Sequence, residues 1–130
     1  MERWLGRHSE VIYAFMRMVV GFLFACHGAQ KLFGALGGQR QLSNPLMVAA
    51  GIIEFFGGGL VGLGLGAGYA AFVASGMMAV AYFMAHAPGG FWPIVNKGEL
   101  AVLYCFVFLY IASRGSGRLS IDALARKRRF

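Results

Sequence analysis

The chain has 130 residues, of which 58% are hydrophobic and 13% are charged, and its formal net charge is +7. Ordinary globular domains have about 45–50% apolar and about 25% charged residues, and a domain this short has too little interior to bury the excess. The composition therefore excludes a soluble domain, a disordered chain and a disulfide-stapled secreted fold. Five of the twelve basic residues follow Gly115, so we interpret the positive charge as a basic tail beside a bilayer and expect no nucleic-acid partner.

Four hydrophobic segments follow one another, at about residues 11–30, 46–65, 68–87 and 99–113. About 20 helical residues cross a hydrocarbon core of about 30 Å, a length that the first three segments reach and the fourth does not quite reach. Pro45 is placed to begin the second helix, glycines at residues 62–68 predict a tight hairpin, and residues 88–93 form the third connection. The sequence thus predicts an all-α membrane protein, with four antiparallel transmembrane helices in one bundle and a single domain over residues 1–130.

The distribution of Lys and Arg predicts the orientation. With four spans both termini lie on one face, which carries eight basic residues, including those of the tail at residues 114–130. The opposite loops carry Lys31, Arg40 and Lys97. Since cytoplasmic loops hold the excess of basic residues, we expect both termini in the cytoplasm.

Two ionisable residues lie deep within the predicted spans. At 1.5 Å per residue, Arg17 is about 9 Å from the cytoplasmic end of the first helix and Glu54 about 12 Å from the outer end of the second. A charge at mid-bilayer costs about 2.5–3.5 kcal/mol on insertion scales, so both should turn inward. We expect a direct or water-bridged pair between them, with a purely structural role as the alternative. Small residues on the same faces predict close helix contacts, namely Gly21, Gly28, Gly51 and Gly58.

A second polar layer is predicted toward the outer face. It gathers His27 and Lys31 from the first helix, Tyr82 and His86 from the third, and Glu99 from the fourth. Polar groups that converge at one depth inside a bundle are typical of a ligand site, although a simply hydrogen-bonded histidine is the alternative for His27 and His86.

The remaining reactive side chains give weaker signals. Cys26 and Cys105 are predicted at comparable depth, where they serve either as redox thiols or as small apolar packing residues. The histidines, acids and cysteines lack the local spacing of metal ligands, so we expect no metal site. No catalytic residue is assigned from the sequence.

Several short motifs resemble the DoxX family. They are Arg17 with Gly21, His27-Gly28-x-x-Lys31-Leu32-Phe33-Gly34, Gly51-x-x-Glu54-x-x-Gly57-Gly58, Gly98-Glu99, and the closing Ser113-Arg114-Gly115-Ser116-Gly117-Arg118-Leu119-Ser120-Ile121-Asp122. The resemblance runs from about Val11 to Ala123 and implies a small multi-pass protein of the bacterial or archaeal inner membrane. One branch of the family is similar to the small subunit of an archaeal thiosulfate:quinone oxidoreductase, and another acts in a membrane complex that handles thiol and oxidative stress.

Two functions remain open at this point. The first is a redox-associated membrane subunit that binds a quinone or similar lipophile within the bundle, at most as a subunit of a quinone-linked oxidoreductase whose electrons come from a partner. The second is a non-catalytic accessory subunit that packs against a larger membrane complex. Transport of a small solute or proton is a third possibility. Each function places the chain in the lipid bilayer, with other membrane subunits or further copies of itself as partners.

Overall fold

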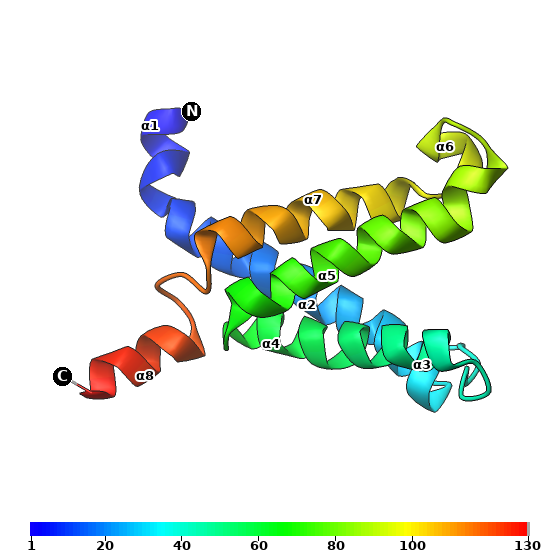
Figure 1. Ribbon diagram of the computed structural model, residues 1–130. Helices are drawn as coiled ribbons and strands as arrows, with labels where there is room; N and C mark the ends of the chain where they lie inside the picture. The colour runs from blue at the N-terminus through cyan, green and yellow to red at the C-terminus, as the bar shows by residue number, and fades with distance from the viewer. Residues whose placement is uncertain (130) are drawn as a thin grey trace.

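The computed structural model of the protein describes residues 1–129, which contain helices and no strand (Figure 1). The first helical run comprises α1 (Glu2–Leu5), the short turn η1 (Gly6–His8) and α2 (Ser9–Phe33). The second comprises α3 (Pro45–Ile52), η2 (Ile53–Gly57) and α4 (Gly58–Leu63), and the third comprises α5 (Ala67–Ala81), η3 (Tyr82–His86) and η4 (Ala87–Gly89). The chain then forms α6 (Pro93–Asn96), α7 (Glu99–Arg114) and α8 (Ile121–Arg129).

Three of these runs are long and apolar enough to cross a membrane. They are Glu2–Phe33 with 32 residues, Pro45–Leu63 with 19 and Ala67–Gly89 with 23. Helix α7 has 16 residues, or about 24 Å at 1.5 Å per residue, which is shorter than the hydrocarbon core. The all-α membrane character of the chain is therefore confirmed, while a fourth span and the orientation remain predictions.

The helix boundaries follow from local sequence signals. The Asn44 side chain accepts a hydrogen bond from the Leu46 amide at 3.1 Å, and Pro45 occupies the first turn of α3. Gly34 ends α2 in the left-handed conformation, with φ 67°. The predicted hairpin lies between α4 and α5, where Gly64 and Gly66 adopt φ values of 71° and 57° that favour glycine.

Two of the long helical runs contain a π-helical turn, which the sequence did not predict. The first is η2, which includes Glu54, and the second is η3, which includes Tyr82 and His86. A π turn inserts one extra residue into the α-helical repeat and changes the direction of the side chains around it. Such turns occur frequently at functional sites.

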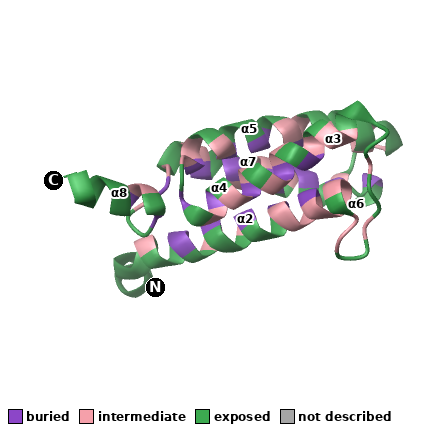
Figure 2. Ribbon diagram, turned by 90° about the horizontal axis from the view of Figure 1, so that it is seen from below, coloured by how far each residue is buried: buried purple, intermediate pink, exposed green. Residues whose placement is uncertain are grey.

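The bundle is built from two helix pairs that meet through aromatic side chains. Helix α2 packs against α4 and η2, and α5 packs against α7. Glycines bring the first pair into backbone contact, because a Cβ on Gly28 would lie 2.3 Å from the Phe55 nitrogen. Buried Phe24 connects the pairs through ring contacts with Tyr104 and Phe108, at centroid distances of 5.3 Å and 4.6 Å. Buried positions face inward along the bundle, and most of its outer surface is exposed (Figure 2).

The C-terminal segment differs from the basic tail predicted at residues 114–130. After α7 the chain folds back against the bundle, where Ser116, Ser120 and Ala123 are buried before and within α8. Both ends of the chain lie at the same end of the bundle, opposite α3 and α6 (Figure 2). Residues 116–123 are thus part of the folded structure, and the description of residues 114–130 as a cytoplasmic tail stays a prediction.

Candidate functional site

The most deeply buried ion pair joins α2 to η2. The Lys31 Nζ atom lies 2.7 Å and 2.6 Å from the two carboxylate oxygens of Glu54. Glu54 is 4% exposed, whereas the side chain of Lys31 is 26% exposed. In a membrane, this pairing reduces the cost of the buried carboxylate, and the aliphatic stem of lysine lets its ammonium group reach inward from the end of the helix.

The predicted contact between Arg17 and Glu54 is not formed. The register of the helices explains this, since Gly28 packs directly against Phe55 and so lies level with Glu54. Arg17 is eleven residues earlier, about 16 Å along α2 at 1.5 Å per residue. The carboxylate therefore meets Lys31, one turn beyond Gly28.

Arg17 instead binds backbone carbonyls, two in the segment that folds back and one in α4. Its Nη1 atom donates to the Ser116 carbonyl, and its Nη2 atom donates to the carbonyls of Leu119 at 3.0 Å and Gly62 at 3.5 Å. The side chain is 1% exposed, and its Nε atom has no hydrogen-bond partner within residues 1–129. Carbonyl oxygens thus replace the carboxylate partner that we expected, and no sequence signal distinguished the two.

Asp122 fastens the same segment to the α4–α5 hairpin. Its Oδ2 atom accepts hydrogen bonds from the Ser116 hydroxyl at 2.7 Å and from the Gly66 amide at 2.8 Å. Its own amide donates to the Gly64 carbonyl at 3.1 Å. The hydrogen bond from Ser116, followed by that from Gly66, holds the pKa of Asp122 below its usual value. The closing motif of the sequence therefore has a structural role, which its composition alone did not reveal.

A second polar cluster lies at the opposite end of the bundle and joins η3 to α6. The Asn96 side chain donates to the Tyr82 hydroxyl at 3.2 Å and to the Gly90 carbonyl at 2.9 Å, and it accepts from the Gly98 amide at 2.8 Å. The His86 Nδ1 atom lies 3.2 Å from the Asn96 carbonyl, so this nitrogen carries the proton. Sequence reasoning missed Asn96, although its place between Pro93 and Gly98 marks a turn where a buried amide satisfies the backbone.

The other residues of the predicted layer do not join one site. His27 is half-buried and stands edge-on to the Tyr104 ring, with centroids 6.2 Å apart. Glu99 is exposed at the start of α7 and forms no ion pair within residues 1–129. The structure therefore divides the layer into the Lys31–Glu54 pair and the cluster around Tyr82 and His86.

The two cysteines lie on different helices as free thiols. Cys26 on α2 and Cys105 on α7 are both half-buried. The Cys105 sulfur lies 3.6 Å from the Ser75 hydroxyl oxygen, and that hydroxyl donates to the Cys105 carbonyl at 2.7 Å. Neither thiol is joined in a disulfide, and their redox use stays a prediction.

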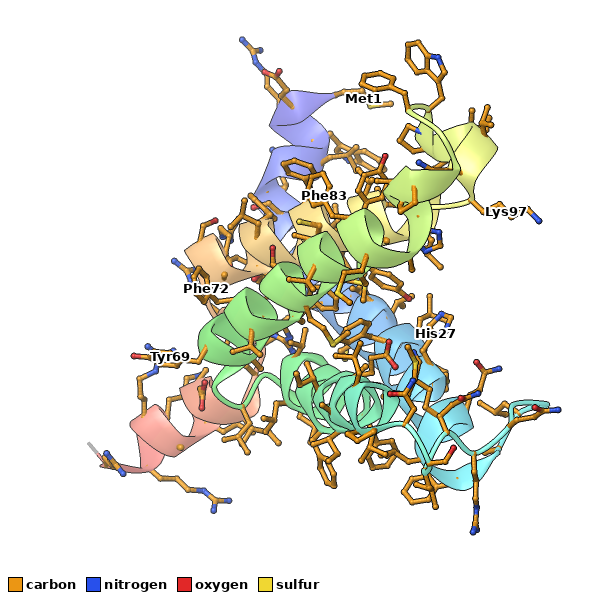
Figure 3. The ribbon with its side chains drawn as sticks, turned by 45° about the vertical axis from the view of Figure 1, so that its right-hand side comes forward. Met1, His27, Tyr69, Phe72, Phe83 and Lys97 are labelled. Atoms are coloured by element: carbon orange, nitrogen blue, oxygen red, sulfur yellow. The ribbon has the colours of Figure 1, made fainter. Side chains whose placement is uncertain are left out.

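An apolar groove of about 650 Å³ lies beside the Tyr82 cluster. Its walls come from α5, η3, the α6 connection and α7, and they include Met78, Tyr82, Phe83, Trp92, Ala101 and Cys105. Figure 3 shows side chains of this region, with Phe83 on η3 and Lys97 beyond α6 labelled. Phe83 and Trp92 are 70% and 65% exposed, so the groove opens on the outer surface that would face lipid.

Comparison with known proteins gives consistent relationships. The DoxX family model matches residues 12–87, a range that includes Lys31, Glu54, Tyr82 and His86. An uncharacterized protein of Haemophilus influenzae is 39% identical over 125 residues, in an alignment that covers 91% of this chain and 93% of that relative. No solved structure matches the chain. With more than half of its length matched by the family model and a relative aligned almost end to end, the chain belongs to the DoxX family.

Proposed function

We propose that this DoxX-family membrane protein binds a quinone or a similarly flat lipophile in the groove between η3 and α7, as a redox-associated subunit. The observation that carries the proposal is the groove itself, a largely apolar space of about 650 Å³ with Tyr82 among its lining residues. Small-molecule sites are commonly apolar clefts of about 300–1,000 Å³ with a few placed polar groups. The groove opens toward lipid, the phase from which such a ligand would enter.

The hydrogen bonds around Tyr82 support a role in holding a carbonyl oxygen. Asn96 donates to the Tyr82 oxygen, which leaves the phenolic proton to be donated elsewhere. In the structure this proton points to the Phe91 carbonyl at 3.5 Å, at the outer limit of hydrogen bonding. A ligand carbonyl in the groove would offer a better acceptor. His86 stands one turn after Tyr82 and contacts the Asn96 carbonyl through its Nδ1 atom, and its imidazole is the group of this cluster to which we assign proton exchange.

The π turn is a second support for placing the site here. A π turn weakens the regular hydrogen-bond pattern of an α-helix, and such turns are found frequently at functional sites. The π turn at Tyr82–His86 therefore supports a functional role for these residues. A bound quinone would carry two electrons and two protons, and the electrons would come from a partner protein or a soluble reductant. The residues of this chain would bind and orient the quinone and would supply its protons.

The membrane arrangement belongs to the same proposal. We take α7 as the fourth span, with both termini in the cytoplasm of a bacterial or archaeal cell and the groove toward the outer face of the inner membrane. The shared position of the termini supports an even number of spans, and Arg114 directly after the apolar part of α7 supports a cytoplasmic interface there. The short α7 fits if Gly98 and Arg114 lie within the headgroup layers.

The accessory-subunit function has less support. Glycine-lined faces are one surface that a partner subunit could approach, but these faces pack within the chain. A Cβ on Gly21 or Gly58 would lie 2.5 Å from backbone atoms of the facing helix. They are therefore unavailable to another protein, and contacts with other membrane subunits or further copies of this chain would have to use different surfaces.

Tryptophan fluorescence offers a direct test, because Trp92 lines the groove and Trp4 lies in α1 at the other end of the bundle. The variant W4F leaves Trp92 as the single tryptophan, and W92F leaves Trp4. In nanodiscs titrated with decylubiquinone and a menaquinone analogue, we expect saturable quenching in W4F and only weak, linear quenching in W92F. Equal quenching curves for the two variants would refute binding in the groove.

A pair of size-matched variants tests the same site by filling it. In the W4F background, Ala79→Phe places a ring in the groove and should abolish saturable quenching, whereas Ala49→Phe on the exposed face of α3 should not. Tyr82→Phe removes one hydrogen bond to the ligand, worth about 0.5–1.5 kcal/mol, and should weaken binding by about two- to tenfold. If Ala79→Phe and Ala49→Phe gave the same curve, the ligand would bind elsewhere.

A further inference from the structure

A cleft of about 700 Å³ lies at the end of the bundle that carries the termini, far from the groove at Tyr82. Four arginines line it, Arg114 from the end of α7, Arg118 from the following loop, and Arg126 and Arg129 from α8. The last two are three residues apart and so share one face of their helix. The fold-back of residues 115–122 onto Arg17 and the hairpin holds this arrangement together.

The positive charge of the cleft is only partly balanced by protein groups. Glu10 binds Arg114 at 2.9 Å, and Asp122 already accepts hydrogen bonds from Ser116 and Gly66. The other three arginines form no ion pair within residues 1–129, and all three are exposed around one concave surface. A concave surface with several unpaired guanidinium groups attracts anions, and the guanidinium group is well suited to bind phosphate oxygens through paired donors.

A second, apolar groove of about 470 Å³ adjoins the cleft. Its walls include Met1, Leu5, Ile12, Met16 and Tyr110, and it shares Arg114 with the basic cleft. Arg114 is held in place between the two by Glu10 and by the ring of Tyr13, whose centroid lies 4.6 Å from the guanidinium carbon. The basic cleft thus continues into the apolar groove where α7 ends. This combination suits an amphiphile with an anionic headgroup and an apolar chain.

We propose that this composite surface is a specific binding site for one anionic phospholipid, with its phosphate among Arg118, Arg126 and Arg129 and an acyl chain along the α1–α2 groove. Free phosphate shares the headgroup chemistry, but it would leave the apolar groove unused. Near a membrane each basic residue contributes about fivefold to the affinity for anionic lipid, so three together contribute about 100-fold. The site is independent of quinone binding, because it lies at the opposite end of α7.

Native mass spectrometry of the full chain in mild detergent tests the proposal, with phosphatidylglycerol and phosphatidylcholine of identical chains as probes. We expect one phosphatidylglycerol to stay bound and phosphatidylcholine to be lost at lower collision energy. The variant R118Q/R126Q/R129Q should bind phosphatidylglycerol about 100-fold more weakly. The matched control R7Q/K127Q/R128Q removes the same charge from residues outside the cleft and should retain the lipid.

Two further arms separate the lipid from free phosphate. Leu5→Ala with Ile12→Ala shortens the apolar groove without changing charge, and we expect it to weaken phosphatidylglycerol binding, while millimolar inorganic phosphate should not displace the lipid. Displacement by phosphate, with no effect of the groove variant, would show that the cleft binds free phosphate and would overturn the lipid proposal. Equal retention of the two lipids, or an equal loss in the two triple variants, would overturn it as well.

Discussion

The Lys31–Glu54 ion pair allows a quantitative prediction of stability, because its two members differ in their access to water. Lys31→Met would leave a carboxylate that is 4% exposed without a partner, and removing one member of a buried ion pair costs about 3–5 kcal/mol. Glu54→Gln would leave an ammonium group whose side chain is 26% exposed and can turn outward, so we expect a smaller loss of about 1–2 kcal/mol.

The double variant K31M/E54Q completes the cycle. With neither charge present, its loss of stability should fall below that of Lys31→Met alone, which gives a coupling energy of about 1.5–3 kcal/mol. Unfolding in mixed micelles with increasing sodium dodecyl sulfate, followed by circular dichroism, measures all four free energies on one scale. A coupling energy within about 0.3 kcal/mol of zero would refute a direct ion pair, and a larger cost for Glu54→Gln than for Lys31→Met would refute the argument from exposure.

Three other substitutions test the packing and the C-terminal fold-back. Gly28→Ala would place a methyl carbon 2.3 Å from the Phe55 nitrogen and should lower stability in the same micelle assay by more than about 2 kcal/mol. The control Gly59→Ala, whose added methyl has no atom within 4 Å, should be neutral or stabilise the protein by up to about 1 kcal/mol. Similar losses of stability in the two variants would contradict the contact between Gly28 and Phe55. Because the pKa of Asp122 is lowered on folding, its ionised form stabilises the protein above the unfolded value of about 3.9, and this contribution is lost as the pH falls through the folded pKa. Asp122→Asn should therefore melt below the wild type at pH 6, with a gap that narrows as the pH falls below about 3.9, and a gap independent of pH would be evidence against this role. Arg17→Lys keeps the charge, but a single ammonium group cannot reach the separate carbonyls of Ser116 and Leu119. Trypsin should therefore cut after Arg118 about tenfold faster, while cleavage after Arg7 is unchanged. An unchanged cleavage rate at Arg118 would argue against the fold-back.

Local signals predicted the helices well, since they depend on neighbours in the sequence. Pro45 after Asn44 and the glycines between α4 and α5 mark boundaries that the structure places where the sequence indicated. The apolar segment at residues 11–30 differs by at most three residues from α2, although the helical run already begins at Glu2, and the segments at 46–65 and 68–87 differ by at most two residues from the runs at 45–63 and 67–89. The burial of Arg17 and Glu54 was also predictable, because a charge inside an apolar helix has few alternatives.

The partners of these charges could not be predicted in the same way. Partner choice depends on the axial register of α2 against η2, and that register is fixed by the backbone contact of Gly28 with Phe55. Arg17 and Lys31 are separated by about four turns of α2, and depth estimates from segment ends do not show which of the two lies level with Glu54. The site around Tyr82 was only half predicted, because Asn96, which organises it, lies in a connecting loop rather than in a hydrophobic segment.

The two π turns bear on how this chain can tolerate changes in length. Each holds one residue more than an α-helix needs over the same rise, so deleting one residue between Ile53 and Gly57, or between Tyr82 and His86, would let the segment relax to an ordinary helix. The helix faces on either side would keep their orientation, whereas the same deletion within α5 or α7 would rotate everything beyond it by about 100°. Natural variants of this protein one residue shorter should therefore carry their gaps at these two places, with the fold intact and the surroundings of Glu54 or Tyr82 rebuilt.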